Sequence, residues 1–234
     1  MKLALLPATL LPATLSAETS LKEQLEARSQ QAAQQIPAEI RTEFAKGIQA
    51  VEKAKITDQA KQIGDLAPNF TLKNHQGTEV SLANLLKDGP VLLTWYRGGW
   101  CPYCNIALAA LQKELPAIKK AGATLVALTP ELPDKSAATI EKGSLQFHVL
   151  TDLNHQIAKE YGLLFKLTPT VTELYKGFFD LHEYNGKEAG NDTLPLAATY
   201  IINTDRTITY AFLKADYRQR AEPSDLIKEL QKLK

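Results

Sequence analysis

The sequence predicts an α/β protein with a central sheet that carries helices on both faces. Short apolar runs of strand type alternate with helix-type segments through most of the chain. Near the end, two strand-type runs flank a short turn and a helix follows them, which predicts an antiparallel hairpin and a terminal helix. The apolar content of 44% over 234 residues is ordinary for a globular protein with one sizeable core. In such sheets, reacting groups gather beyond the carboxyl ends of the parallel strands.

Residues 1–17 resemble a short secretory signal. Lys2 precedes an apolar stretch, and small residues up to Ala17 come before an expected cut ahead of Glu18. Export to the periplasm or the medium is the expectation, in which case the cysteines work in an oxidising compartment and need a dedicated electron donor there. The alternative is an uncleaved terminus and a cytoplasmic protein, because two prolines interrupt the apolar run.

Residues 18–62 predict a helical extension. They are rich in Ala, Gln, Glu and Lys, and they form two expected helices over about 20–35 and 37–55, separated by Pro37. A short helical turn follows before Gly64. We expect this extension to pack on the main domain or on a second subunit and to carry no chemistry.

Residues 63–234 predict the main domain. Its expected strands cover 70–72, 80–82, 91–95, 124–129, 147–150, 198–202 and 208–213. Its expected helices cover 82–86, 102–120, 135–142, 152–161, 168–177 and 223 to the end, with Ser81 and Thr170 as caps. Residues 178–191 show no clear period and are interpreted as an insertion.

Both cysteines lie where the strand after residue 91 leads through a Gly98-Gly99 turn into a helix. Pro102 fits the first helical position, which makes Cys101 the N-cap. Free amide groups and the helix dipole at that position favour a thiolate on Cys101. Cys104 lies one turn further on the same face, close enough for a disulfide. The pair is therefore suited to cycle between dithiol and disulfide.

Several other kinds of site are disfavoured. Two cysteines are too few for a disulfide framework, and a zinc site would need two further ligands, so no metal or cofactor is expected. His148 and His155 have no metal-pair spacing and are interpreted as solvated or core residues. A net charge of +1 suggests no nucleic acid partner, and no membrane-spanning segment is expected. The alternative for the cysteines is a buried structural pair or a permanent disulfide.

Five stretches together resemble a known family. They are residues 64–72 (GDLAPNFTL), 96–105 (YRGGWCPYCN), 160–163 (EYGL), 194–202 (LPLAATYII) and 220–223 (RAEP). They are similar to the peroxiredoxin-like branch of the alkyl hydroperoxide reductase and thiol-specific antioxidant family. The resemblance covers the chain from about Leu21 onward and implies a thioredoxin-like fold, with a mixed central sheet and helices on both faces.

The resemblance implies a thiol-dependent peroxidase acting on hydrogen peroxide or organic hydroperoxides. Cys101 matches the cysteine that attacks the peroxide and becomes a sulfenic acid, and Cys104 would resolve it to a disulfide. That sequence fits the chemistry of thiolates and sulfenic acids. A reductant of thioredoxin or glutathione type would then reopen the disulfide.

The chain departs from the family pattern near the cysteines. Gly98 stands where the family has Thr, and Ala197 stands where it has Arg, so groups that polarise the peroxide are under-supplied. Arg97, in the loop before Cys101, is an available cation. Arg218 and Arg220 are further cations, but surface ion pairs are the simpler interpretation for both.

The remaining expectations concern the surroundings of the pair. Trp100 and Tyr103 are interpreted as packing residues, with an apolar wall for an alkyl hydroperoxide as the alternative. Thioredoxins and glutaredoxins carry a cis-proline just before the position of Thr199, and here that residue is Ala198, which disfavours general disulfide exchange. The expected supporting residues are Arg97, Gly98, Trp100, Pro102, Tyr103 and Thr199. A thiol-disulfide oxidoreductase or a non-catalytic redox-sensing module remains an alternative function. A homodimer is possible, and the electron donor and the preferred peroxide stay open.

Overall fold

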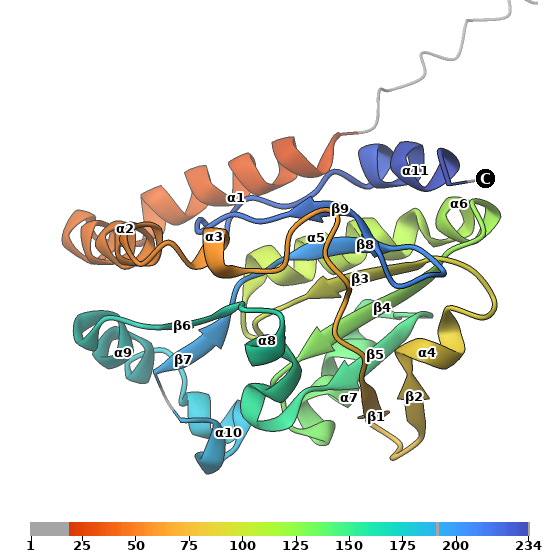
Figure 1. Cartoon of the computed structure of the whole chain (residues 1–234). Helices are drawn as coiled ribbons and strands as arrows, with labels where there is room; N and C mark the ends of the chain where they lie inside the picture. Colours follow the sequence, from red (N-terminus) through yellow and green to blue (C-terminus); the bar gives the residue numbers. More distant parts are fainter. Residues whose placement is uncertain (1–18, 191, 234) are drawn as a thin grey trace, which may run out of the picture.

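A computed structural model describes residues 19–190 and 192–233, so the predicted signal at 1–17 lies outside the described residues (Figure 1). The helices are α1 Leu21–Gln35, α2 Ala38–Lys53, α3 Ile56–Gln59, α4 Leu82–Leu85, α5 Pro102–Lys113, α6 Leu115–Lys120, α7 Pro133–Gly143, α8 Gln156–Glu160, α9 Pro169–Lys176, α10 Leu181–Asn185 and α11 Pro223–Gln231. The strands are β1 Thr71–Asn74, β2 Glu79–Ser81, β3 Val91–Trp95, β4 Thr124–Thr129, β5 His148–Thr151, β6 Leu164–Lys166, β7 Thr193–Pro195, β8 Thr199–Ile202 and β9 Ile208–Phe212. Among these helices, none has the length and apolar character that a membrane crossing requires.

The central sheet has seven strands in the order β2-β1-β5-β4-β3-β8-β9. Strands β3, β4 and β5 are parallel, whereas β8 runs antiparallel to β3 and to β9. Strand β1 pairs antiparallel with both β2 and β5. This mixed sheet confirms the predicted α/β class and the late hairpin, and it places the end of β3 near the middle of the sheet edge.

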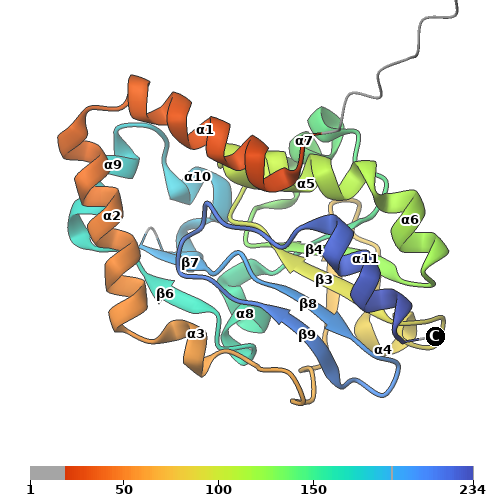
Figure 2. The same ribbon diagram turned by 90° about the horizontal axis from the view of Figure 1, so that it is seen from above.

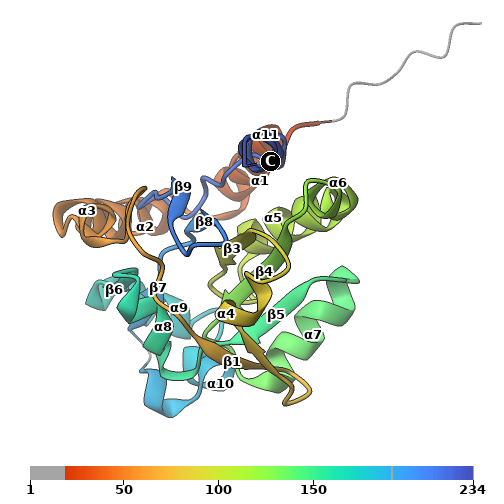
Figure 3. The ribbon, with the colours of Figure 1, turned by 45° about the vertical axis from the view of Figure 1, so that its right-hand side comes forward.

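Both faces of the sheet are buried because alternate residues of the central strands are apolar on each side. On one face, Leu93 and Val126 pack with Tyr161, next to α8 and α4. On the other face, Leu92 and Leu125 pack against α5, α6 and α11. Figure 3 shows the sheet with α5 and α7 on one side and α8 on the other.

Two helices differ from their predicted bounds. The cysteine helix does not continue to residue 120 but stops at Lys113, and α6 begins anew at Leu115. Pro116 explains the break, since proline has no N–H for the helix ladder and its ring crowds the preceding turn. Helix α9 is capped by Thr168, whose hydroxyl accepts the Val171 N–H at 3.3 Å, and not by Thr170.

The region after α8 holds elements that the sequence did not predict. Strands β6 and β7 form a separate two-stranded antiparallel sheet, and each is only three residues long. Segments this short carry too little periodicity to be recognised. The insertion interpretation of residues 178–191 was also incomplete, because α10 and a short 3-10 turn at Lys187–Ala189 lie within it.

The helical extension packs on the domain. Helix α1 lies along α5, and α2 lies against α9, as Figure 2 shows from above. Leu21 and Leu25 of α1 are buried in the cluster that contains both cysteines. The Glu222 carboxylate accepts the N–H groups of Leu21 at 2.8 Å and Lys22 at 3.1 Å, so the segment before α11 holds the start of α1. The extension therefore forms one wall of the cysteine site.

Candidate active site

The cysteine pair lies beyond the carboxyl end of β3, at the start of α5. Pro102 is the first helical residue and Cys101 is the N-cap, as predicted. The Cys101 N–H donates to the Gly98 carbonyl at 3.0 Å, and the Asn105 N–H donates to the Cys101 carbonyl at 3.1 Å. Both cysteines are free thiols, and they are only 2% and 0% exposed. The pair is thus reduced, adjacent and shielded from bulk water.

Gly98 has a steric reason to be glycine. Its φ of +149° is a conformation that side chains of L residues rarely adopt, and a Cβ there would lie 2.2 Å from Nε1 of Trp100. The threonine of the family pattern could not occupy this position unless the Trp100 indole moved. The missing hydroxyl is therefore linked to the placement of Trp100.

Arg97 is a buried cation in an aromatic cage. It is 1% exposed, one of its Nη2 hydrogens is donated to the Tyr175 hydroxyl, and its guanidinium lies 4.2 Å from the centre of the Tyr217 ring and 5.0 Å from that of Trp100. Burial favours the neutral form, but the Tyr175 hydroxyl and the Cys101 thiol outweigh it and raise the pKa of Arg97 above its usual range. No ion pair joins Arg97 to a carboxylate among the described residues, and the groups whose negative forms favour its charge are the Tyr175 and Tyr217 hydroxyls and the two thiols.

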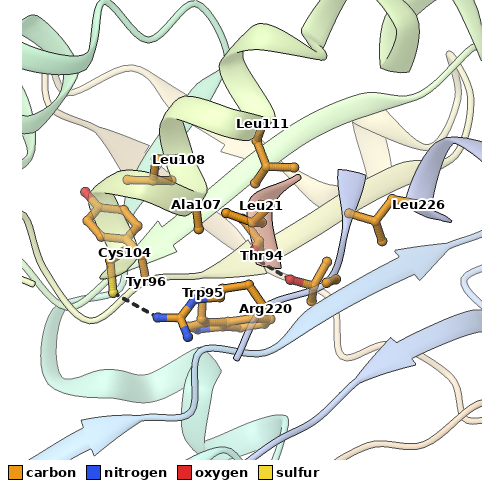
Figure 4. A pocket seen from close by; sticks show the side chains of 12 residues that line it. Leu21, Thr94, Trp95, Tyr96, Cys104, Ala107, Leu108, Leu111, Arg220 and Leu226 are labelled. Atoms are coloured by element: carbon orange, nitrogen blue, oxygen red, sulfur yellow. Dashed lines mark hydrogen bonds between the residues drawn. The ribbon is translucent and has the colours of Figure 1, made fainter. Parts of the chain in front are cut away.

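Arg220 comes from the loop before α11 and reaches the second cysteine. Its Nη2 lies 3.2 Å from Sγ of Cys104, and Figure 4 shows the guanidinium pointing at that sulfur. Its Nη1 donates to the carbonyl oxygens of Tyr217 and, at 2.8 Å, of Gln219. The ion pair expected for Arg218 is confirmed, with Nε 2.8 Å from Oδ1 of Asp216. For Arg220 the expectation was wrong, because this loop folds back over the cysteine site.

The two sulfurs differ in how they hold charge. Burial raises the pKa of Cys101 well above its usual value, and the hydrogen bond and charge of Cys104 raise it further. Burial acts the same way on Cys104, but the Cys101 thiol, Arg220 and Arg97 outweigh it and hold the pKa of Cys104 well below its usual value. The backbone N–H of Arg97 also donates to Sγ of Cys104, at 3.5 Å. The Arg220 guanidinium and the Arg97 backbone N–H both point at the sulfur of Cys104, so they favour a thiolate there, whereas the sequence predicts the thiolate on Cys101.

A small cavity borders this charge. It has a volume of about 10 Å³ and is lined by Cys104, Arg220, Thr94 and Thr199, among apolar neighbours such as Leu21 (Figure 4). The hydroxyls of Thr94 and Thr199 lie 2.9 Å apart and hydrogen-bond to each other across β3 and β8. A space of this size holds about one water molecule. Thr199 thus contributes to the wall beside Cys104.

The other predicted aromatic residues serve packing. Trp100 stacks on Phe179 with ring centres 4.4 Å apart. Tyr103 accepts a hydrogen bond from Ser29 of α1 at 3.3 Å and meets the edge of Tyr217 at 5.7 Å. Tyr103 therefore joins α1 to the site, and its hydroxyl hydrogen bond goes to α1 and not to a thiol.

Glu131 is a site neighbour that sequence reasoning missed. It follows β4, its side chain is 0% exposed, and its Oε1 accepts the Gly99 N–H at 2.8 Å. Burial raises the pKa of Glu131, partly offset by that hydrogen bond. The carboxyl group therefore braces the glycine turn before Cys101. Its position directly after a buried strand next to β3 was the available signal.

His155 is buried and His148 is exposed, in line with the core and solvated interpretations. Within residues 19–190 and 192–233, no group of three or more His, Cys, Asp or Glu side chains could hold a metal ion.

The model of the AhpC/TSA family matches residues 63–211, more than half of the chain. The chain belongs to the AhpC/TSA family. Both cysteines lie inside the matched region, whereas Arg220 lies beyond it. Similar proteins include Peroxiredoxin Bcp of Escherichia coli K12, which is 30% identical over 100 residues that cover 43% of this chain and 64% of the relative. Peroxiredoxin Q, chloroplastic, of Populus jackii is 33% identical over 100 residues that cover 43% of this chain and 46% of the relative.

The matches thus span less than two thirds of the length of these relatives. Solved structures of similar shape include Peroxidoxin BcpB from Mycobacterium tuberculosis, with a TM-score of 0.58 and 20% identity over 74% of this chain and 98% of that one. A peroxiredoxin-like protein from Aquifex aeolicus also gives a TM-score of 0.58, with 15% identity over 75% of this chain and 89% of that one. At this identity the likeness shows the fold, which is thioredoxin-like.

Proposed function

We propose that this AhpC/TSA protein is a thiol-dependent peroxidase in which Cys101 attacks the peroxide and Cys104 resolves the product. The observation that carries this proposal is the pair itself: two reduced, buried thiols one helical turn apart, supplied with two cations, Arg97 and Arg220. The names of the relatives, peroxiredoxins Bcp and Q, support it.

The first step needs the charge on Cys101. The thiol of Cys101 and the thiolate of Cys104 exchange their shared proton, and the Cys101 thiolate then attacks one peroxide oxygen. The bond between sulfur and oxygen forms as the oxygen–oxygen bond breaks, which leaves Cys101 as a sulfenic acid. The departing hydroxide or alkoxide takes a proton from solvent and leaves as water or an alcohol. Arg97 lies at the pair, where it stabilises the thiolate and the developing charge on the leaving oxygen.

The burial of the pair favours small substrates in the reduced state. Cys101 is 2% exposed and Cys104 is 0% exposed, so neither sulfur lies at the surface, where it could attack a protein disulfide. A hydroperoxide can diffuse into such a site far more readily. This supports the peroxidase over the thiol-disulfide oxidoreductase, and a thioredoxin- or glutathione-type donor would reach the oxidised pair after local opening.

Rapid-mixing experiments test the proposal. Reduced protein should react with hydrogen peroxide or an organic hydroperoxide at least tenfold faster than free cysteine, and Cys101→Ser should abolish that reaction because the nucleophile is gone. Cys104→Ser should still react once and stop as a sulfenic acid that a cyclic diketone traps.

Two results would contradict this. If neither peroxide reacts faster than with free cysteine, and Cys101→Ser changes nothing, the peroxidase is excluded. Fast exchange with glutathione disulfide in place of peroxide would instead indicate the thiol-disulfide oxidoreductase. A disulfide that forms slowly, with no turnover by any donor, would indicate a redox-sensing module.

A further inference from the structure

The loop before α11 holds a guanidinium against the sulfur that is not the expected nucleophile. Nη2 of Arg220 lies 3.2 Å from Sγ of Cys104, a residue 116 positions earlier in the chain. Cys104 is completely buried and Arg220 reaches it from the wall opposite α5 (Figure 4). A charge-assisted hydrogen bond of this kind is roughly twice as strong as a neutral one.

The side chain of Arg220 is fixed and not simply folded over the surface. Its Nη1 donates to two carbonyls of its own loop, those of Tyr217 and Gln219. The loop is anchored at one end by the paired contacts of Arg218 with Asp216, at 2.8 and 2.9 Å. At the other end, Glu222 accepts the first N–H groups of α1. No carboxylate in the described part of the chain forms an ion pair with Arg220, so its charge is directed at the thiol.

We propose that Arg220 is a positioning residue that keeps Cys104 ready as the resolving thiolate, so that the sulfenic acid on Cys101 is consumed as it forms. This inference rests on the proposed peroxidase. In the resolving step the Cys104 sulfur attacks the Cys101 sulfur, the S–S bond forms and the S–O bond breaks. The leaving hydroxide takes a proton from solvent and departs as water. Cys104 is oxidised and the sulfenic sulfur is reduced, so no further reactant is needed.

The arrangement also accounts for the charge distribution. In the reduced state, the thiolate on Cys104 accepts a hydrogen bond from Cys101, and that proton moves to Cys104 when Cys101 attacks. After Cys101 is oxidised, Arg220 remains beside Cys104 and favours loss of the proton again. Resolution then competes well with a second peroxide, which would carry the sulfenic acid on to sulfinic acid.

The test compares Arg220→Gln with Lys214→Gln, which removes the same charge from an exposed side chain ahead of the loop and leaves both the Arg218–Asp216 anchor and the Cys104 contact in place. Each reduced protein is treated with hydrogen peroxide in the presence of a cyclic diketone, and trapped sulfenic acid and sulfinic acid on Cys101 are measured by mass spectrometry. Arg220→Gln should lengthen the life of the sulfenic acid roughly tenfold, since one charged hydrogen bond is lost, and should raise sulfinic acid accordingly. Lys214→Gln should match the parent, and Arg220→Lys should reverse part of the change seen in Arg220→Gln.

A second background shows through which sulfur Arg220 acts. In Cys104→Ser, adding Arg220→Gln should leave the rate of Cys101 oxidation unchanged. If Arg220→Gln slows the oxidation of Cys101 in this background as much as it does when Cys104 is present, Arg220 acts on Cys101 and the inference is overturned. Equal trapping in parent and Arg220→Gln overturns it as well.

A peroxide-free measurement separates this inference from the proposed function. In Cys101→Ser, thiolate absorbance at 240 nm followed against pH reports Cys104 alone. It should titrate below the value of about 8.5 that is usual for cysteine, and adding Arg220→Gln should move the midpoint upward by about one pH unit. No movement would refute the role of Arg220 even if the protein is a peroxidase. A clear movement in a protein that ignores peroxide would leave the contact established and exclude the peroxidase.

Discussion

Arg97 is the residue whose burial constrains the site most. A buried guanidinium is costly to desolvate unless negative charge or polar groups compensate it, and in the described residues its partners are the Tyr175 hydroxyl, aromatic faces and the cysteine pair. The thiolate is therefore the anion that balances this cation. The cage and the thiolate stabilise each other.

Replacing that cation should weaken the thiolate. Arg97→Met keeps an apolar chain in the cage but removes the charge, so the pH at which the pair first ionises should rise by about one unit or more. At neutral pH the reaction with peroxide should then slow about tenfold or more. Thiolate absorbance at 240 nm and rapid mixing with peroxide measure the two effects. Arg97→Lys, which retains the charge, should recover much of the ionisation, and an unchanged ionisation in Arg97→Met would disprove the pairing.

At the scale of elements, the sequence predicted the surroundings of Cys101 from local chemistry alone. Pro102 has no N–H to donate to a preceding carbonyl, so it fits the first position of α5 and places Cys101 at the N-cap. The contacts of Tyr217 and Arg220 could not be foreseen in that way. Their loop has no periodicity, and its partners lie more than 100 residues earlier in the chain. Only tertiary packing brings them to the pair.

Helix α1 offers an element that can be tested directly. Glu222 accepts the Leu21 and Lys22 N–H groups at the positive end of this helix, in addition to the local capping box of Ser20 and Glu23. Glu222→Gln should cost about 1 kcal/mol of unfolding free energy, the usual effect of a lost cap. Hydrogen exchange at Leu21 and Lys22 should accelerate.

Glu26→Gln is the matched control for this change. Glu26 lies on the exposed face of α1, 4.0 Å from Lys22 in a solvated ion pair, and its loss should change stability by no more than about 0.5 kcal/mol. Urea unfolding gives both values. If the two variants lose the same stability, the hydrogen bonds that Glu222 accepts from α1 stabilise the fold no more than an exposed charge does.

At the scale of the whole molecule, His155 makes stability depend on pH. It is 2% exposed, neither ring nitrogen has a hydrogen-bond partner in the described residues, and burial lowers its pKa from 6.5 to about 4. Between these values the unfolded chain binds a proton that the folded chain excludes. The free energy of unfolding should therefore fall as pH drops from about 6.5 to 4, by on the order of 3 kcal/mol from this residue.

His155→Asn isolates that contribution, because Asn tolerates the left-handed backbone of this position, where φ is 56°. The variant should lose less stability than the parent on acidification from pH 7 to pH 4.5, whatever the other titrating groups do in both proteins. Urea unfolding at several pH values measures the difference. Parallel curves for parent and variant would show that His155 does not sense pH.

The contacts between Arg220 and Cys104, and between Glu222 and Leu21, have a consequence for biosynthesis. The partners of the first are 116 residues apart and those of the second 201 residues apart. A ribosome adding 5–20 residues per second needs on the order of ten seconds to pass from Cys104 to Arg220. During that interval the nascent chain carries its two thiols without the loop that covers them. The newly made protein therefore has a short period in which its cysteines are open to oxidants and to wrong partners.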